Sequence, residues 1–210
     1  ADGAKKSTAA AAPKKKAMNG GQTIRKSSIL NKVDTAKFVT GTKLEAITNY
    51  VLNIPSDEKC IVFSQFASML DIIAFWLQKK GLRVVKLLGS MPLVSRQSMI
   101  SQFKHDDDIR VILISLKAGG EGLNLQNANH VVLTDPWWNP AVEMQAVQRA
   151  HRIGQTRPVK AVRFVSRGTV EERMMDLQEK KLLVFEGTID GKTNSLQRLT
   201  EEALQFLFTR

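Results

Sequence analysis

Three short runs of wholly apolar residues follow one another through the middle of the chain, at 60–63, 111–114 and 131–133. None has a polar residue that would face water, so each indicates a strand buried on both faces of a sheet. Two further strands are expected at 84–88 and 159–165. Longer segments with helical spacing separate these strands. The alternation predicts an α/β sandwich with a mostly parallel central sheet flanked by helices.

The expected helices have recognisable starts and stops. Pro55 ends the first, Gly81 the second and Gly154 the fourth, while the Thr169-Val-Glu-Glu172 segment is a capping box that opens the fifth. Helices are expected from Thr42 to Pro55 and at 66–80, 92–103, 141–153, 169–183 and 196–208. In such folds the working residues lie in loops at the carboxyl ends of the strands, which makes those loops the places to look for a site.

The charge is concentrated near the start of the chain. The net charge is +11 over 210 residues, and residues 1–37 hold nine Lys and Arg against two Asp. We expect a flexible, basic Ala/Lys-rich leader at 1–36, with nucleic acid as the polyanionic partner. A merely solubilising leader is the alternative. The rest is expected to form a lobe at 37–168 and a helical brace of the same lobe at 169–210.

Several classes of protein are excluded by composition. A single cysteine, Cys60, excludes a disulfide framework and a cysteine-based zinc site, and fits a reducing compartment. No run of 18 apolar residues is present, so no membrane partner is expected. The first residue is Ala and not Met, which favours a fragment or a processed piece, although a natural truncation stays open.

A glycine-rich segment, KAGGEGLN, follows the apolar run that ends at Ile114. Glycines at such a place let backbone N–H groups approach a phosphate. A dinucleotide-binding turn is one rival, with Asp135 as the acid that binds the ribose. The glycine spacing is G-G-x-G, however, and the seven residues between Gly122 and His130 are too few for a crossover helix. A purely structural turn is the other alternative.

Two arginines, Arg149 and Arg152, lie three residues apart in the helix expected at 141–153. On a helix they would share one face, and two guanidinium groups there suit a phosphoryl group whose charge grows during transfer. The alternative is a solvated basic face. His151 between them is expected to hydrogen-bond or pack, because no second metal ligand lies nearby in the sequence.

A third segment imitates a phosphate-binding loop. Gly187 to Thr193 has three residues between its two glycines, whereas the loop needs four, so we interpret it as a flexible connection. The chain contains no other candidate for that loop, and no Asp-Glu pair ends a strand where Mg²⁺ would bind.

Five segments occur together in an order and spacing that resemble the second RecA-like lobe of SWI/SNF-type ATPases of helicase superfamily 2. The resemblance runs from about Phe38 to Arg210. The segments are CIVFSQF at 60–66, LGS at 88–90, SLKAGGEGLNL at 115–125, DPWWNP at 135–140 and QAVQRAHRIGQ at 145–155. The DPWWNP form and the ending LTEEALQFLF are similar to the excision-repair branch, which has plant members.

The resemblance implies a site divided between nucleotide and DNA. It assigns arginine fingers to Arg149 and Arg152, and nucleotide contacts to Gly122 and Gln145. Trp137 is expected in the core, and Arg96 is expected either on a phosphate or beside an acid. The implied DNA contacts are Ser64, Gln65, Gly89, Ser90, Ser115, Lys117 and Trp138.

The function implied is the C-terminal lobe of a DNA-dependent ATPase that translocates on double-stranded DNA. ATP is the implied cofactor, with Mg²⁺ held mainly by a first RecA-like lobe. The isolated chain is expected to be inactive. Implied partners are duplex DNA, that first lobe, and nucleosomes or repair factors, in the nucleus. A truncated DNA- or partner-binding module and a small-molecule-binding α/β domain are the alternatives. The biological substrate, an upstream RING domain and the oligomeric state stay open.

Overall fold

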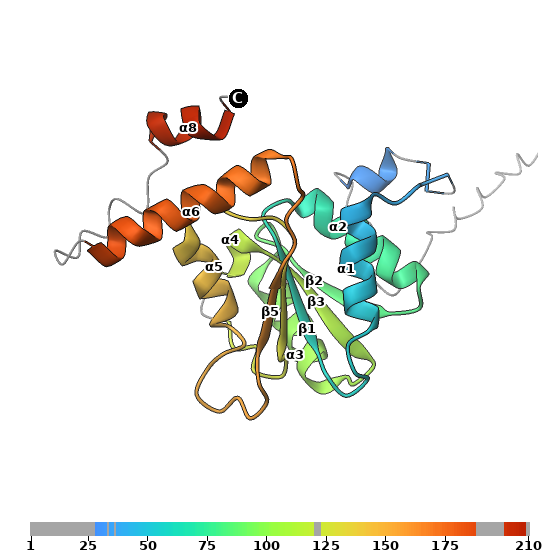
Figure 1. Cartoon of the computed structure of the whole chain (residues 1–210). Helices are drawn as coiled ribbons and strands as arrows, with labels where there is room; N and C mark the ends of the chain where they lie inside the picture. The colour runs from blue at the N-terminus through green and yellow to red at the C-terminus, as the bar shows by residue number, and fades with distance from the viewer. Residues whose placement is uncertain (1–27, 33, 36, 120–122, 188–199, 209–210) are drawn as a thin grey trace, which may run out of the picture.

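Five parallel strands form one sheet in the order β2-β3-β1-β4-β5 (Figure 1). The computed structural model describes residues 28–32, 34–35, 37–119, 123–187 and 200–208. The strands are β1 (Cys60–Ser64), β2 (Arg83–Leu87), β3 (Ile109–Ser115), β4 (His130–Leu133) and β5 (Lys160–Arg163). The predicted α/β fold with a parallel central sheet is confirmed.

Strand β1 lies in the centre and is buried on both faces. Its register pairs Cys60 with Val111 of β3 and with His130 of β4. Successive side chains of a strand point to opposite faces. Ile61 and Phe63 accordingly pack in one core cluster, whereas Val62 packs in the other together with Cys60. The wholly apolar composition of the run follows from this position.

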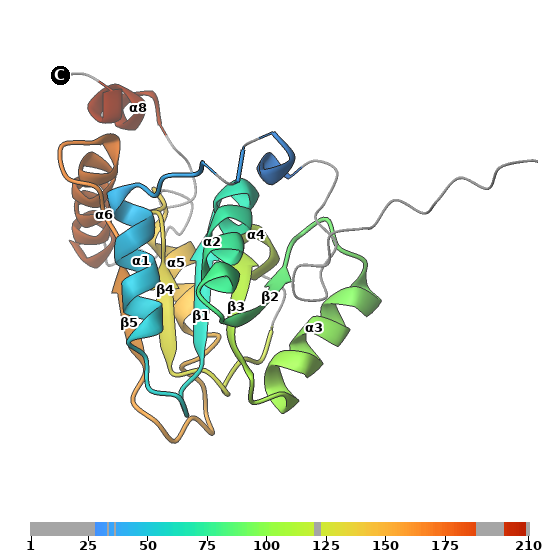
Figure 2. The same cartoon turned by 90° about the vertical axis from the view of Figure 1, so that its right-hand side faces the viewer.

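Helices cover both faces of the sheet. Figure 2 shows α1 and α2 in front of it and α5 behind it. Helices α1 and α2 supply apolar side chains to the core cluster that contains Val62, and α3 and α5 supply theirs to the cluster that contains Phe63. The helices are α1 (Thr42–Leu52), α2 (Ala67–Lys79), α3 (Leu93–His105), the short α4 (Leu116–Gly119) and α5 (Pro140–Val147).

Helix α5 is shorter than its sequence predicts. It ends at Val147 instead of Ile153, and the chain continues through a series of turns. The backbone carbonyl of Arg149 accepts a hydrogen bond from the N–H of Leu125, 3.2 Å away, in a different segment. This long-range hydrogen bond therefore uses a carbonyl that, in a continued helix, would accept from the N–H of Ile153. The prediction of a helix through Arg149 and Arg152 is wrong.

The C-terminal segment forms α6 (Val170–Gly187) and α8 (Glu201–Phe208), and α8 packs against α6 (Figure 1). The predicted capping residues lie at the start of α6. The hydroxyl of Thr169 accepts from the N–H of Glu171, and the Glu172 carboxylate accepts from the N–H of Gly168, 2.7 Å away. The imitation phosphate loop falls almost entirely in 188–199, outside the described residues.

The described part of the expected leader contains one turn of 3₁₀ helix, η1 (Ile29–Asn31). Ser28 caps this turn and is buried, and η1 contacts α2. Residues 1–27 lie outside the described residues, so the flexible leader stays a prediction. None of the helices in the described ranges is both long enough and apolar enough to cross a membrane.

The central position of β1 predicts a protected thiol. Burial raises the pKa of the Cys60 thiol, so little of the reactive thiolate forms. We expect a thiol reagent to modify Cys60 only as fast as the protein unfolds, measured by labelling followed by mass spectrometry. A Ser68→Cys variant, at an exposed position on α2, serves as the accessible control. Labelling of Cys60 at the rate of that control would contradict the buried position of β1.

Candidate nucleotide and DNA interface

The connections from β1 and β4 leave the sheet on opposite faces. Strand β1 leads into α2 on one face, and β4 leads into α5 on the other. These two strands are neighbours in the sheet, so a crevice opens beyond their carboxyl ends. Open α/β sheets bind their ligands in such a crevice. The predicted segments that follow β1, β3 and β4 therefore meet here, whereas Arg149 and Arg152 lie between the end of α5 and the start of β5, at the amino ends of the strands.

Asp135 ties together the loops at this crevice. Its carboxylate accepts from the hydroxyl of Ser64 at 2.6 Å, from the backbone N–H of Gln65 at 2.8 Å, and from the hydroxyl of Thr134. Asp135 is buried, as is Ser64. The carboxylate therefore fixes the loop after β1 to the loop after β4. The ribose-binding role considered for Asp135 has no support in this geometry, because its oxygens bind the protein.

The predicted DNA contacts divide into exposed and buried groups. Gly89 and Ser90, in the loop after β2, are exposed, and so is Lys117 after β3. Ser115 is buried, and the Ser64 side chain is wholly buried on Asp135. A buried hydroxyl cannot reach a phosphate, so Ser64 serves in this structure as an internal tie between loops. The exposed members stay predicted DNA contacts.

Arg96 shapes the loop after β2. Its Nε donates to the carbonyl of Met91 at 2.9 Å, and its Nη2 donates to the carbonyl of Gly89. The guanidinium therefore fixes the backbone on both sides of Ser90 by hydrogen bonds. Both donors named here bind carbonyl oxygens of its own loop, and we interpret Arg96 as a residue that positions Gly89 and Ser90.

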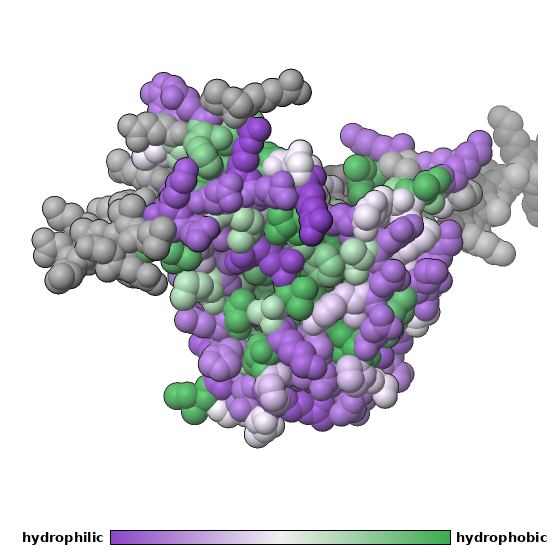
Figure 3. Space-filling model, in the orientation of Figure 1, coloured by the Kyte–Doolittle hydropathy of each residue, from purple (hydrophilic) through white to green (hydrophobic). Residues whose placement is uncertain are grey.

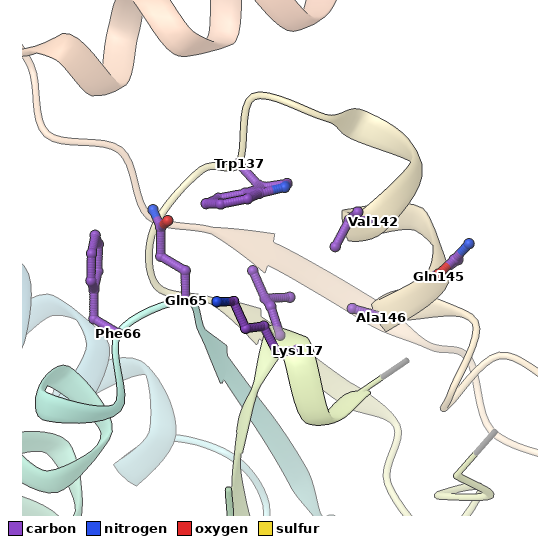
Figure 4. A pocket seen from close by; sticks show the side chains of 8 residues that line it. Gln65, Phe66, Lys117, Trp137, Val142, Gln145 and Ala146 are labelled. Carbon is purple, nitrogen blue, oxygen red and sulfur yellow. The ribbon is translucent and has the colours of Figure 1, made fainter. Parts of the chain in front are cut away.

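A pocket of about 520 Å³ opens at the crevice (Figure 4). In Figure 4 the Lys117 side chain extends toward Gln65 near the ring of Trp137, whereas Gln145 points away from Lys117 on α5. The site residues Gln65 and Lys117 are thus brought together, and Gln145 lies at the rim. The lining comes from the loops after β1 and β4 and from the helices α4 and α5, and consists of Gln65, Phe66, Leu116, Lys117, Trp137, Val142, Gln145 and Ala146.

The two tryptophans face different surroundings. Trp137 is half-buried and packs on the core cluster that contains Phe63, in agreement with its predicted place in the core. Trp138 packs against Leu177 and Leu207 of the brace helices, and the ammonium of Lys181 lies 4.5 Å from the centre of its ring. Burial lowers the pKa of Lys181. In this structure Trp138 joins the lobe to its brace, and its contact with DNA stays a prediction.

Arg149 and Arg152 lie on the turns that follow α5, in a loop we call the arginine loop (148–155). Arg152 is exposed, and its Nη1 is 3.5 Å from the carbonyl of Leu123, which follows the last glycine of the glycine-rich segment. His151 is exposed in the same loop, which disfavours the packing role and leaves the hydrogen-bonding role a prediction. Both arginines therefore lie beside the glycine-rich segment, brought there by the loop and not by a helix face.

The glycine-rich segment is described only in part. Gly122 lies in 120–122, outside the described residues, so its predicted nucleotide contact is not placed by the structure. A second pocket of about 790 Å³ lies between the segment that follows and the arginine loop. Within the described ranges, no three His, Cys, Asp or Glu side chains gather in a group able to hold a metal ion.

Sequence reasoning missed a second buried carboxylate, that of Glu143 on α5. It accepts from the backbone N–H of Trp137 at 2.6 Å, from the amide of Gln178 on α6 at 2.9 Å, and from Arg163 on β5. Glu143 thereby joins the loop after β4, which carries Trp137, to the brace helix α6. The only signal in the sequence was an acid two residues after Ala141, on an expected helix with an apolar side.

The Asp135 contacts predict a measurable loss of stability. In Asp135→Asn an amide NH₂ replaces one acceptor oxygen and meets an N–H or a hydroxyl that needs an acceptor. We expect the free energy of unfolding in urea to fall by about 2 kcal/mol. Asp107→Asn is the control, because that carboxylate is fully exposed, and we expect it to cost less than about 0.5 kcal/mol. Equal effects of the two substitutions would show that Asp135 does not hold the loops together.

Comparisons with known proteins agree with this site. The family described as "Helicase conserved C-terminal domain" matches residues 42–154. The ATP-dependent helicase rhp16 of Schizosaccharomyces pombe is 42% identical over 191 residues, which are 90% of this chain and 22% of the relative. The DNA repair protein RAD5 of Cryptococcus neoformans is 43% identical over 166 residues, 77% of this chain and 14% of the relative.

A solved structure of the C-terminal part of the Fun30 ATPase domain has the same RecA-like fold. It superposes with a TM-score of 0.66 at 34% identity, over 70% of this chain and 48% of that one. The chain spans about a fifth or less of the length of the curated relatives named above. The resemblance stated from the sequence is confirmed: the chain belongs to the helicase C-terminal domain family, and its relatives are helicases of the SWI/SNF type.

Proposed function

We propose that this chain is the second RecA-like lobe of a DNA-dependent ATPase that translocates on double-stranded DNA in DNA repair or chromatin remodelling. The observation that carries the proposal is the arginine loop. It presents Arg152 at the surface and holds Arg149 and Arg152 beside the segment that follows the glycines. Two guanidinium groups presented by one loop suit a polyphosphate.

The proposed division of labour follows from what the chain contains. Arg149 and Arg152 stabilise the charge that develops on the transferred phosphoryl group, as arginine fingers do. Gln145 and Gly122 contribute nucleotide contacts. The sequence has no phosphate-binding loop with the required spacing, so a first lobe supplies that loop and most of the Mg²⁺ ligands. The isolated chain is then not an ATPase.

The proposed DNA surface lies on the loops after β2 and β3. Gly89, Ser90 and Lys117 are exposed there, and the half-buried Gln65 lines a pocket together with Lys117. Contacts of this kind read the phosphate backbone and carry no sequence information. The basic leader adds charge of the same sign. Nuclear localisation, with nucleosomes or repair factors as further partners, belongs to the same proposal, because relatives are DNA repair proteins.

A chimera tests the catalytic half of this proposal. This chain replaces the matching segment of the rhp16 helicase, whose remainder then provides the first lobe. We expect the chimera to hydrolyse ATP with stimulation by duplex DNA, measured as steady-state phosphate release. Arg149→Ala and Arg152→Ala should each lower the turnover number by about 10³-fold or more.

Arg157→Ala serves as the matched control, because Arg157 pairs with Asp57 on the surface. We expect that variant to keep the turnover of the unmodified chimera. A chimera with full turnover after either finger is removed would contradict the assignment of the fingers. DNA-stimulated hydrolysis by the isolated chain would contradict the need for a first lobe.

Binding of duplex DNA by the isolated chain should depend steeply on salt. Each lysine or arginine that neutralises a phosphate adds about −0.9 to the slope of log K against log [salt]. We expect Lys117→Gln to weaken binding equally on unrelated sequences and to make the slope less steep by about one. Lys104→Gln is the control, because it removes the same charge in the last turn of α3, away from the loop after β2. A slope unchanged by Lys117→Gln would remove Lys117 from the DNA surface.

If the chain is only a DNA-binding module, its basic leader supplies most of its affinity for DNA. Deletion of 1–27 would then abolish DNA binding, and the chimera would bind DNA without hydrolysing ATP. Under the proposed function the deletion weakens binding, and the contacts on the β2 and β3 loops remain.

A further inference from the structure

The arginine loop is held in place by two glutamines that reach across to each other's segment. Gln155, at the end of the loop, donates its amide to the carbonyls of Gln126 and Ala128, each 2.9 Å away. Gln126 in turn donates its amide to the carbonyl of Ile153 in the loop. We call these two residues, with the bonds between their segments, the glutamine clasp.

The clasp fixes both flanks of Arg152. On one side, the amide of Gln155 also lies 3.4 Å from the carbonyl of Ala150, and the N–H of Gln155 donates to the carbonyl of Arg152. On the other side, Gln126 holds Ile153. The side-chain oxygen of Gln155 accepts from the N–H of Arg157 at 3.0 Å, which fixes the exit of the loop. Each end of the short arginine-bearing segment is therefore bound to the protein by a glutamine amide.

The backbone geometry between these anchors depends on glycine. Gly154 has φ = +99°, a region that side chains rarely adopt, and a Cβ there would lie 3.5 Å from the amide of Gln126. Ile153 next to it is fully exposed, so no apolar contact of its side chain holds the loop. Polar contacts to the backbone are thus the main restraint on the exposed part of the loop.

We propose that Gln126 and Gln155 are positioning residues that hold Arg149 and Arg152 in the geometry needed for catalysis. The inference rests on the proposed function and deepens it. Neither glutamine has to touch nucleotide or DNA for this role, because both act through the backbone of the arginine loop. A misplacement of about 1 Å in a catalytic group can lower turnover by on the order of 10²-fold. Loss of the clasp should therefore affect turnover more than binding.

The first test uses the isolated chain and requires no catalysis. Gln155→Met keeps the length of the side chain but removes its donors and acceptor. We expect amide hydrogen exchange in the loop, at 149–157, to become at least about tenfold faster, while exchange in β1 and β3 is unchanged. Gln97→Met, at an exposed position on α3, is the matched control and should change neither. Unchanged exchange in the loop of Gln155→Met would overturn the proposal.

The second test uses the chimera with the rhp16 helicase. We expect Gln155→Met and Gln126→Met to lower the turnover number by about 10- to 100-fold. The KM for ATP and the Kd for duplex DNA should stay within about twofold of the unmodified chimera. Gln155→Glu should be more damaging than Gln155→Met, because a carboxylate would face the same carbonyl oxygens. Turnover left unchanged by Gln155→Met would mean that the glutamine only fills space.

The outcomes separate this proposal from the function on which it rests. If Arg149→Ala and Arg152→Ala abolish turnover and Gln155→Met leaves it intact, the clasp proposal is wrong and the proposed function stands. If Gln155→Met lowers turnover, DNA binding and melting temperature in parallel, the glutamine has a purely structural role and the proposal also fails. If the unmodified chimera shows no turnover, the proposed function fails, and the exchange experiment still decides whether the clasp orders the loop.

Discussion

The central strand β1 is the constraint on which the remainder of the lobe depends. It is hydrogen-bonded to β3 on one side and to β4 on the other, and it is buried on both faces. Parallel pairing brings the carboxyl ends of these three strands to one edge of the sheet. The loops that follow these strands therefore lie close together. The Asp135 carboxylate then joins the loop after β4 to the loop after β1 by hydrogen bonds.

At several places in the lobe, buried or half-buried polar side chains hold segments together, as apolar packing does elsewhere. Asp135 joins the loops after β1 and β4, Glu143 joins α5 to the brace, and Gln155 joins the arginine loop to the segment after the glycines. Such side chains fix the direction of a loop as well as its distance, because hydrogen bonds are directional. Apolar contacts alone would hold the loops less specifically. Exposed groups such as Lys117 and Arg152 are thereby presented from a rigid base.

The strands were predictable because their burial is recorded directly in composition. Each wholly apolar run became a strand of the sheet, with ends within about two residues of those expected. The end of α5 was not predictable from local pattern. Val147 and Ala150 continue a helical spacing, and the helix stops because the carbonyl of Arg149 binds Leu125, 24 residues earlier in the chain. Propensity carries no information about such a partner.

The candidate site was predictable as a set of loops and less so residue by residue. The resemblance assigned the arginines and Gly122 to one nucleotide site, and the structure brings Arg152 beside Leu123 through a turn and not through a helix face. The resemblance assigned Ser64 to a DNA phosphate. The local sequence gives no sign that its side chain is buried on a distant aspartate. The clasp glutamines were invisible for the same reason, since each depends on a carbonyl in another segment.

The most direct test of the claim that this lobe needs a first lobe to hydrolyse ATP is steady-state ATP hydrolysis by this chain alone, compared with the chimera that contains a first lobe. Each is measured with and without duplex DNA. The account predicts no turnover above background for the chain alone, and DNA-stimulated turnover for the chimera. Turnover by the chain alone that disappears in Lys192→Ala would contradict it, because the segment from Gly187 to Thr193 would then be a working phosphate loop.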